Sequence, residues 1–257
     1  MPSPTEVIPR FAGTAVLITG AGSGVGRATC VRLAREGGQV MGFDIDGDGL
    51  KGTADLVAEA GGTLHIRQGD VSVPGECKAA VAEAVQTLGQ LDVLGNVAGI
   101  ARADHVVDVT EESYRRMMGV NADGYFFMAQ AAIPHLLETS GTIVNIASCA
   151  GLIGQAYTVV YCMSKGAVVQ LTRALAMEFA KTPLRVNAIA PAGIVTNLTG
   201  NYQMPEDVDF DLIMPYAGFR PMAEPDEIAN LFAFLASYEA ANLNGAILST
   251  DGGVTAG

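Results

Sequence analysis

Positive charge is scarce in this sequence. The chain has 15 lysines and arginines against 27 aspartates and glutamates, a formal net charge of −12 at pH 7. Such an excess of negative charge repels the phosphates of nucleic acids and the anionic headgroups of membranes. We therefore expect neither nucleic acid nor a membrane as a partner.

Cysteine and histidine are few and scattered. The chain holds four cysteines, with no CxxC pair, and three histidines. Metal ions and disulfides need such side chains in clusters or pairs, so we expect no metal site. The cysteines are best explained as small buried apolar groups in a reducing compartment, which favours a cytoplasmic location.

No hydrophobic run is long enough for a transmembrane helix. The most apolar helical stretch, 125–137 (YFFMAQAAIPHLL), is short and contains Gln130, Pro134 and His135. The start, MPSPTEVIPRFAG, lacks a basic segment followed by an apolar one, so we expect no secretion signal. The chain is nevertheless apolar overall, with 49% hydrophobic residues, which is typical of a sheet covered on both faces.

Short apolar runs alternate with helix-length segments along the chain. Continuous apolar runs are typical of parallel strands covered by helices on both faces. We therefore predict an α/β protein with one domain over residues 1–257 and a doubly wound, seven-stranded parallel sheet. The predicted strands are 14–20, 39–44, 63–70, 91–99, 141–148, 184–191 and 246–250.

One long interval, 196–220, follows a predicted strand and shows no regular pattern. It is rich in Asn, Asp, Pro and Met. A loop of this length in a compact domain is usually functional or mobile, and ligands of such sheets bind beyond the carboxyl ends of the strands. We predict that 196–220 is a lid over the substrate.

A glycine-rich segment, TGAGSGVG (19–26), joins the first predicted strand to a helix. Glycines there allow a tight turn and a close approach of the backbone to a pyrophosphate, whose charge the helix start attracts. Asp44 ends the second predicted strand, where a carboxylate can accept hydrogen bonds from both hydroxyls of an adenosine ribose. A solvated aspartate at a strand end is the alternative.

The spacing TGxxxGxG resembles the short-chain dehydrogenase/reductase family, and the resemblance extends over about residues 12–257. It implies a Rossmann fold with a single dinucleotide-binding catalytic domain. GDV (69–71) is similar to the family's adenine-contacting segment, NVAG (96–99) to the segment after the fourth strand, and APAGIVT (190–196) to the segment that holds the nicotinamide carboxamide. Ala192 stands where the family usually has glycine. The implied cofactor-binding residues are Gly20, Gly22, Ser23, Gly24, Val25, Gly26, Asp44, Ile45, Asp70, Val71, Asn96, Ala98, Gly99, Tyr161, Lys165, Pro191, Ile194 and Thr196.

The residues around Asp44 favour NAD over NADP. Relatives that prefer NADP place a basic residue in the glycine loop or just after the second strand, and here these positions are Ser23 and Ile45. Asp44 itself would repel a 2′-phosphate.

Tyr161 and Lys165 lie four residues apart and so share one face of a helix. Moving a hydride from an alcohol requires a base for the hydroxyl proton, and a nearby ammonium favours the phenolate form of tyrosine. We expect Lys165 to lower the pKa of Tyr161. The resemblance adds Ser148, which would bond the substrate oxygen, and Asn121, which would hold a water beside the lysine. For Asn121, a residue that merely bends its helix is the alternative.

Gln155 and Tyr157 are predicted to line the substrate pocket, although a packing role is about as plausible for Tyr157. The lid segment is apolar and acidic, with no basic residue before Arg220, so a neutral, apolar secondary alcohol or ketone is favoured. The apolar lid residues are Leu198, Tyr202, Met204, Phe210, Leu212, Ile213, Met214 and Tyr216.

The sequence thus favours an NAD-dependent secondary-alcohol dehydrogenase. Two alternatives stay open: an NADPH-dependent 3-ketoacyl or carbonyl reductase, which Asp44 disfavours, and a non-catalytic NAD-binding regulator, which would not need Tyr161 and Lys165. The predicted helix around 124–137 is apolar on nearly all sides, and similar proteins pair it between subunits. We therefore expect a homotetramer.

Overall fold

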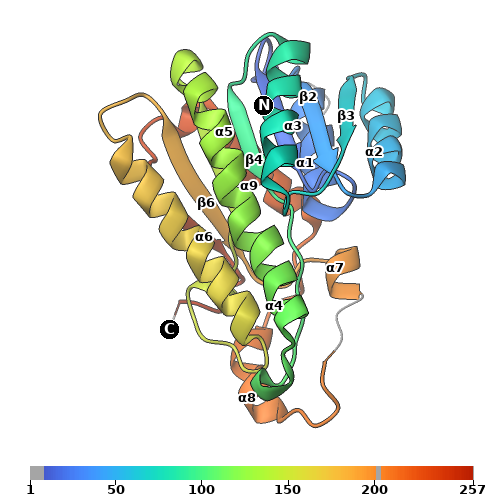
Figure 1. The fold of residues 1–257 in the computed structure, drawn as a ribbon, viewed down its shortest axis with the longest axis vertical. Coiled ribbons are helices and arrows are strands. Elements are labelled where there is room, and N and C mark those ends of the chain that lie inside the picture. The colour runs from blue at the N-terminus through green and yellow to red at the C-terminus, as the bar shows by residue number, and fades with distance from the viewer. Residues whose placement is uncertain (1–8, 201–203, 257) are drawn as a thin grey trace, which may run out of the picture.

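The computed structural model describes residues 9–200 and 204–256, which form a parallel sheet between two layers of helices (Figure 1). The seven strands lie in the order β3-β2-β1-β4-β5-β6-β7, so the chain begins near the middle of the sheet and winds outward in both directions. This confirms the predicted doubly wound Rossmann fold. The strands are β1 (Ala15–Thr19), β2 (Gln39–Asp44), β3 (Leu64–Gln68), β4 (Val93–Asn96), β5 (Thr142–Ile146), β6 (Arg185–Pro191) and β7 (Ile247–Thr250).

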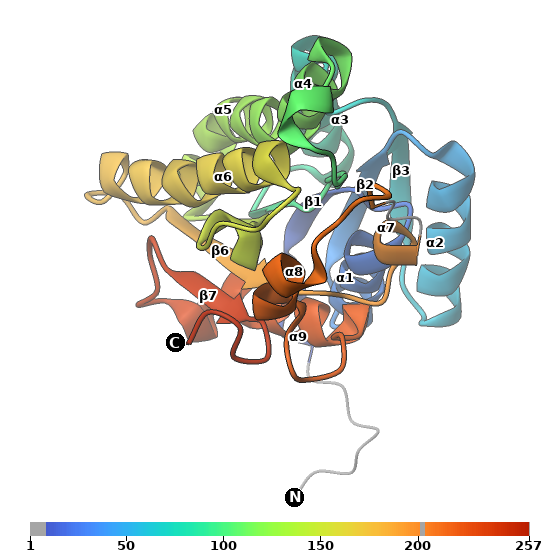
Figure 2. The same ribbon diagram turned by 90° about the horizontal axis from the view of Figure 1, so that it is seen from below.

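Helices cover both faces of the sheet, as Figure 2 shows. α1, α2 and α9 pack on one face, and α3, α5 and α6 on the other, with α4 leading into α5. Within the described residues, no helix combines the length and the hydropathy needed to cross a bilayer. The helices are α1 (Gly24–Arg35), α2 (Gly47–Glu59), α3 (Pro74–Leu88), α4 (Glu111–Met118), α5 (Gly124–Thr139), α6 (Val159–Glu178), α7 (Asn197–Gly200), α8 (Phe210–Ala217) and α9 (Pro225–Ala236).

The central strand β1 shows why the strand sequences are apolar at successive positions. Val16 and Ile18 belong to the core beneath α1 and α9, Leu17 belongs to the core beneath α3 and α5, and all three are fully buried. Alternate side chains of a strand point to opposite faces, so a strand covered on both sides needs apolar residues throughout. Each such burial stabilises the fold by about 2 kcal/mol.

The strand order also decides where a ligand can bind. β2 lies on one side of β1 and β4 on the other, so the connections that follow β1 and β4 diverge to opposite sides. Their divergence opens a crevice at the carboxyl ends of these strands, which is the usual ligand site of an open α/β sheet.

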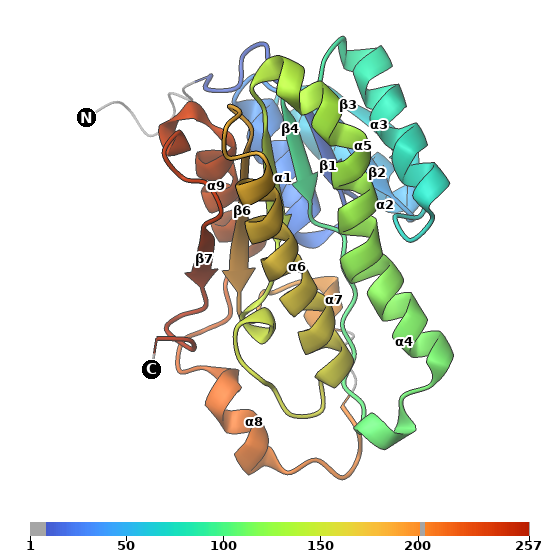
Figure 3. The ribbon, with the colours of Figure 1, turned by 60° about the vertical axis from the view of Figure 1, so that its left-hand side comes forward.

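The interval 196–220 is more regular than its sequence indicates. It contains α7 and α8, which lie beyond the carboxyl ends of β6 and β7 (Figure 3). Asp209 caps α8, because its carboxylate accepts the N–H of Asp211. Asn, Asp and Pro favour turns as well as helix starts, so composition alone indicated an irregular loop. Residues 201–203 of the predicted lid, including Tyr202, lie outside the described residues.

Candidate active site

A cavity of about 580 Å³ lies at the crevice, and its walls come from six strand ends and the lid. It brings together most of the residues predicted from the sequence. Those that line it are Gly20, Ser23, Gly24, Val25, Gly26, Asp44, Ile45, Asp70, Val71, Ala98, Gly99, Ser148, Gln155, Tyr161, Lys165, Pro191, Ile194 and Thr196. Four predicted residues are not in its lining: Gly22, Asn96, Asn121 and Tyr157.

The glycine loop packs too closely to accept side chains. A Cβ on Gly26 would lie 1.9 Å from the carbonyl oxygen of Gly20, and a Cβ on Gly20 would lie 2.7 Å from the Cα of Ala98. Gly20 also has a φ of +68°, which favours glycine. The Ser23 side chain does not cap α1, and the first residues of that helix line the cavity. This end of the cavity therefore suits an anion.

Thr19 fastens the glycine loop to the loop after β4. Its hydroxyl oxygen accepts the N–H groups of Val97 and Ala98, at 2.9 and 3.1 Å, and the hydroxyl donates to the carbonyl of Gly95 at 3.4 Å. The Thr19 side chain is almost completely buried. The two loops that border the crevice therefore have a fixed separation.

The Asp44 carboxylate lies in the cavity wall beside the glycine loop. One of its oxygens accepts the N–H of Gly22 at 2.8 Å and the other accepts the N–H of Asp46 at 2.9 Å. Gly22, predicted to touch the cofactor, thus faces Asp44 and orients it. Each carboxylate oxygen keeps a lone pair, so Asp44 can still accept hydrogen bonds from a ligand.

Arg116, which sequence reasoning missed, also lines the cavity. Its guanidinium donates to the Asp70 carboxylate at 2.6 Å and to the Ser72 hydroxyl at 2.7 Å. Partial burial disfavours the charge of Asp70, but hydrogen bonds from Ser72 and Arg116 outweigh it and hold the pKa of Asp70 below its usual range. Arg116 comes from α4, far from Asp70 in the chain, so no local pattern could reveal the pair.

Tyr161 lies in the cavity wall near Ser148. Burial raises the pKa of the Tyr161 phenol to about 12, and the Ser148 hydroxyl offsets part of that rise. The expectation that Lys165 lowers this pKa is therefore wrong for this structure. The amine nitrogen of Lys165 lies 6.0 Å from the centre of the Tyr161 ring, and the cost of burying a phenolate prevails over attraction at that distance.

The Lys165 amine turns toward the end of β5. It donates to the carbonyl of Ile146 at 2.9 Å and to the Tyr125 hydroxyl at 3.4 Å. Its side chain is almost wholly buried, and burial lowers the pKa of Lys165 to about 7. The amine can thus exchange its proton near neutral pH.

Asn121 lies in a single π-helical turn, Gly119–Asp123, between α4 and α5. Its amide oxygen accepts the N–H of Ile100 at 2.9 Å, and its amide nitrogen donates to the Ile100 carbonyl at 2.8 Å and to the Ser164 hydroxyl at 3.1 Å. Asn121 therefore ties the loop after β4 to α6 from beneath the cavity wall. A Cβ on Gly99 would lie 3.4 Å from both the Asn121 oxygen and the Lys165 amine, so the two groups are neighbours.

Asn96 is buried beneath the cavity and does not face it. Its amide donates to the Asn145 side chain at 3.0 Å and to the Tyr125 carbonyl at 3.4 Å. These neighbours use the donor group of the side chain to join β4 to β5 and α5, so a cofactor contact of Asn96, which stays a prediction, would have to come from its backbone.

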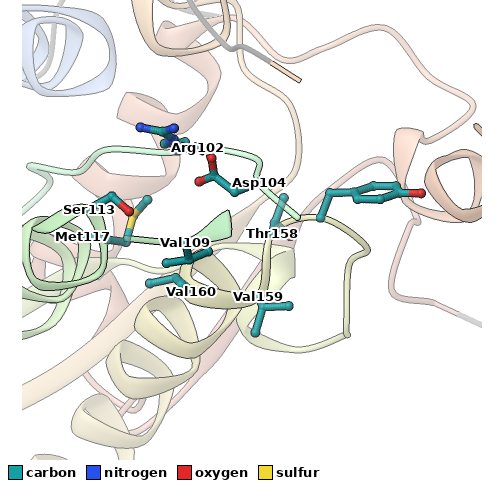
Figure 4. A pocket seen from close by; sticks show the side chains of 9 residues that line it. Arg102, Asp104, Val109, Ser113, Met117, Thr158, Val159 and Val160 are labelled. Carbon is teal, nitrogen blue, oxygen red and sulfur yellow. Dashed lines mark hydrogen bonds and ion pairs between the residues drawn. The ribbon is translucent and has the colours of Figure 1, made fainter. Parts of the chain in front are cut away.

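Tyr157 also differs from its prediction as a pocket wall. Its hydroxyl oxygen accepts the N–H of Asp209 at 2.8 Å, its carbonyl accepts the N–H of Asp104 at 2.8 Å, and its ring packs edge-on against His105. Tyr157 has a φ of +64°, which is unusual for a tyrosine, and it is not in the lining of the main cavity. It borders a separate pocket of about 20 Å³, drawn in Figure 4, which is large enough only for water. Gln155, by contrast, lines the main cavity as predicted.

Ala192 follows β6 without backbone strain. Among the described residues other than glycine, a positive φ occurs at Ser140 and Tyr157, so Ala192 has an ordinary backbone conformation. It lines the cavity together with Gly193 and Ile194. Alanine in place of the usual glycine therefore leaves this wall intact.

A Rossmann sheet with a glycine-rich helix start at its crevice defines a dinucleotide-binding type of α/β protein. A family model described as enoyl-(acyl carrier protein) reductase matches residues 20–255. The chain belongs to the short-chain dehydrogenase/reductase family, as the sequence motifs indicated.

Its relatives match over almost their whole length. Meso-2,3-butanediol dehydrogenase of Serratia marcescens is 39% identical over 248 residues, 96% of each chain. The crystal structure of a short chain dehydrogenase from Mycobacterium paratuberculosis bound to NAD has a TM-score of 0.89 at 30% identity, covering 96% of this chain and 100% of that one. Carveol dehydrogenase from Mycobacterium avium in complex with NAD has a TM-score of 0.87 at 29% identity, covering 96% and 99%.

Proposed function

We propose that this protein is an NAD-dependent oxidoreductase that interconverts a neutral, apolar secondary alcohol and its ketone. The observation that carries the proposal is that Ser148, Tyr161 and Lys165 meet in the wall of one cavity that also contains Asp44 and the glycine loop. Proton transfer and dinucleotide binding can therefore occur at one site.

The proposed chemistry needs a group that exchanges a proton with the substrate oxygen. Tyr161 is that general acid and base, and the Ser148 hydroxyl bonds the same oxygen and stabilises its changing charge. Lys165, with a pKa near 7, passes the proton onward, and Asn121 positions the turn beside it. NAD, when bound, supplies the acceptor and donor of the hydride.

Asp44 supports NAD as the cofactor. Its carboxylate faces the cavity with Ile45 next to it. Of the two cavity-lining cations, Arg116 is paired with Asp70, and the Lys165 amine is bonded to the end of β5. A 2′-phosphate would meet the Asp44 charge without a free cation to offset it. Two related structures contain NAD, which is consistent with this choice. Cofactor contacts are proposed for the cavity-lining residues of the glycine loop, 69–71, 98–99 and 191–196.

The cavity walls support a neutral substrate. The lid contributes Leu198 and Tyr216, and Met222 lies on the same wall. No cation of the described lid faces the cavity, so a carboxylate or phosphate would have no partner there. The related proteins are named for butanediol and carveol, which are uncharged secondary alcohols.

A panel of neutral acyclic and cyclic secondary alcohols, assayed for NAD reduction, tests the proposal. Tyr161→Phe should keep NADH binding, measured by fluorescence, and lose turnover by at least about 100-fold, which is a typical contribution of general acid–base catalysis. Tyr238→Phe, at an exposed tyrosine outside the cavity, is the matched control. Full activity of Tyr161→Phe would refute the mechanism. Turnover of the wild type with NADPH alone would favour a carbonyl reductase. Tight NADH binding by the wild type without any turnover would favour a regulator.

We further propose that the protein is a cytoplasmic homotetramer. Phe126 on α5 and Val159 and Met163 on α6 are each more than 40% exposed, at 44%, 43% and 49%, and burial between subunits would remove them from water. The four cysteines are unpaired, which suits a reducing compartment. Sedimentation equilibrium tests the assembly, and a monomer at micromolar concentration would refute it.

A further inference from the structure

We propose that Tyr125 is a positioning residue for Lys165, holding its amine against the end of β5 beside the cavity. The proposal rests on the proposed function, because Lys165 matters to turnover only if Tyr161 exchanges a proton with substrate. Tyr125 is not in the lining of the cavity, and neither the motifs nor the proposed mechanism so far gives it a part.

The placement of Tyr125 is tightly fixed. Tyr125 is the second residue of α5, four residues after Asn121, and it is 2% exposed. Its ring packs in a core with Ala147 of the β5 end and Val168 and Val169 of α6. A residue held in this way cannot change rotamer without opening that core.

Three polar atoms meet beneath the cavity wall. The Tyr125 hydroxyl donates to the Ile146 carbonyl at 3.0 Å, and the Lys165 amine donates to the same carbonyl at 2.9 Å. The amine also donates to the Tyr125 hydroxyl at 3.4 Å and lies 5.2 Å from the centre of the Tyr125 ring. Because Ile146 ends β5 two residues before Ser148, this cluster ties the lysine to the strand that carries Ser148.

The amine depends on these contacts, because it has no opposite charge beside it. Among the described residues, Lys165 forms no ion pair, and burial is the dominant influence on its pKa. The groups that face it are Tyr125 from α5, Tyr161 from α6, the Ile146 carbonyl from β5 and the uncharged Asn121 amide. Burial raises the pKa of Tyr125, so its phenol stays neutral and serves as a hydrogen-bond acceptor and a π face for the ammonium.

Tyr125→Phe separates the hydroxyl from the ring, because phenylalanine keeps the packing and the π face. Without the hydroxyl, the ammonium loses an acceptor, so Lys165 is protonated less readily. In the proposed mechanism the neutral amine of Lys165 takes up the proton passed on from Tyr161, so the pH dependence of turnover should follow the pKa of Lys165. We expect the proton affinity of Lys165 to fall about threefold, the effect of one weak neutral hydrogen bond. We also expect the limb of the pH profile of kcat for alcohol oxidation that follows Lys165 to move to lower pH, by roughly half a pH unit.

The first measurement needs no catalysis. The chain has four lysines, so 13Cε-labelled lysine gives few NMR signals, and the one lost in Lys165→Met is that of Lys165. Its titration midpoint in the wild type should be near 7 and should fall in Tyr125→Phe but not in the control Tyr238→Phe. Nuclear Overhauser contacts between the Lys165 ε-protons and an aromatic ring, assigned to Tyr125, should be seen in the wild type.

The second measurement is the pH dependence of kcat and of the KM for NAD in the same variants. We expect the limb of the kcat profile that follows Lys165 to lie roughly half a pH unit lower in Tyr125→Phe, and Tyr238→Phe to match the wild type. An unchanged Lys165 titration and pH profile in Tyr125→Phe would overturn the proposal. If that variant does not fold, the wild type alone still tests the proposal, because the absence of Overhauser contacts between Lys165 and Tyr125 would also overturn it. If the wild type oxidises no alcohol, the NMR titration still decides the Tyr125 contact, so failure of the proposed function is recognised separately.

Discussion

Lys165→Met should make the protein more stable near neutral pH while abolishing its proposed activity. Methionine has a similar length and no branch, so it can fill the space of the buried lysine stem. The Ile146 carbonyl would keep a donor, because the Tyr125 hydroxyl remains bonded to it. The substitution therefore removes a buried amine without leaving a buried acceptor unpaired.

The magnitude follows from the depressed pKa of Lys165, about 7 in the fold against 10.5 for an ordinary lysine. The unfolded chain binds this proton up to about pH 10.5, whereas the folded protein releases it above about pH 7, so the wild type gains stability as pH rises between these values. The gain is about 1.4 kcal/mol for each pH unit. At pH 7 nearly the whole cost, about 4.5 kcal/mol, is present. The substitution also loses the two hydrogen bonds of the amine, about 1 to 1.5 kcal/mol each, so we expect the variant to be about 2 kcal/mol more stable.

Urea unfolding of the wild type and of Lys165→Met at pH 7, 8 and 9 measures this difference, with equal m-values as the test that the comparison is valid. The advantage of the variant should shrink as pH rises. Lys181→Met, at an exposed lysine, should show neither effect. A Lys165→Met protein that is less stable than the wild type at pH 7, or whose difference from it does not depend on pH, would refute the reasoning.

Three further predictions concern the cofactor, the lid and pH. Asp44→Ser should weaken NADH binding about tenfold, the effect of losing a charged acceptor, and should reduce the preference over NADPH; fluorescence titration with both cofactors measures this, and an unchanged preference would contradict it. Tyr157→Phe should leave kcat unaltered and raise the KM for substrate up to about fivefold, because the Asp209 N–H of the lid loses its hydrogen-bond partner. Limited proteolysis should then cleave the lid faster than in the wild type, and equal cleavage rates would count against the contact. Burial raises the pKa of Tyr161 to about 12, so its phenolate form is scarce at pH 7. The rate of alcohol oxidation should therefore rise toward alkaline pH, whereas the rate of ketone reduction should not. An oxidation rate that falls between pH 7 and 9 would contradict this expected pH dependence.

The sheet and the cofactor end of the cavity could be predicted because their signals are local. The seven strands are continuous apolar runs, and the glycine loop follows β1 directly. Close packing at Gly20 and Gly26 could be predicted from the glycines themselves, since no residue with a side chain fits there. Asp44 is likewise fixed by its place at the end of β2.

The polar contacts at the chemical end could not be predicted, because they depend on residues distant in the chain. Helical spacing placed Lys165 beside Tyr161, but the Ile146 carbonyl and Tyr125, from other elements, decide where the amine points. Arg116 reaches Asp70 from α4 in the same way. Spacing within one helix predicts which face of the helix carries a side chain. The hydrogen-bond partner of that side chain depends on how the helix packs against other elements.

Thr19 gives the crevice a property that concerns entropy. The distance between the glycine loop and the loop after β4, which are both proposed to contact the cofactor, is set by one buried hydroxyl and by the close approach of Gly20 to Ala98. The two loops would therefore already have their final spacing before an extended cofactor binds. The ordering of these loops belongs to folding, so little of the binding free energy is spent on it.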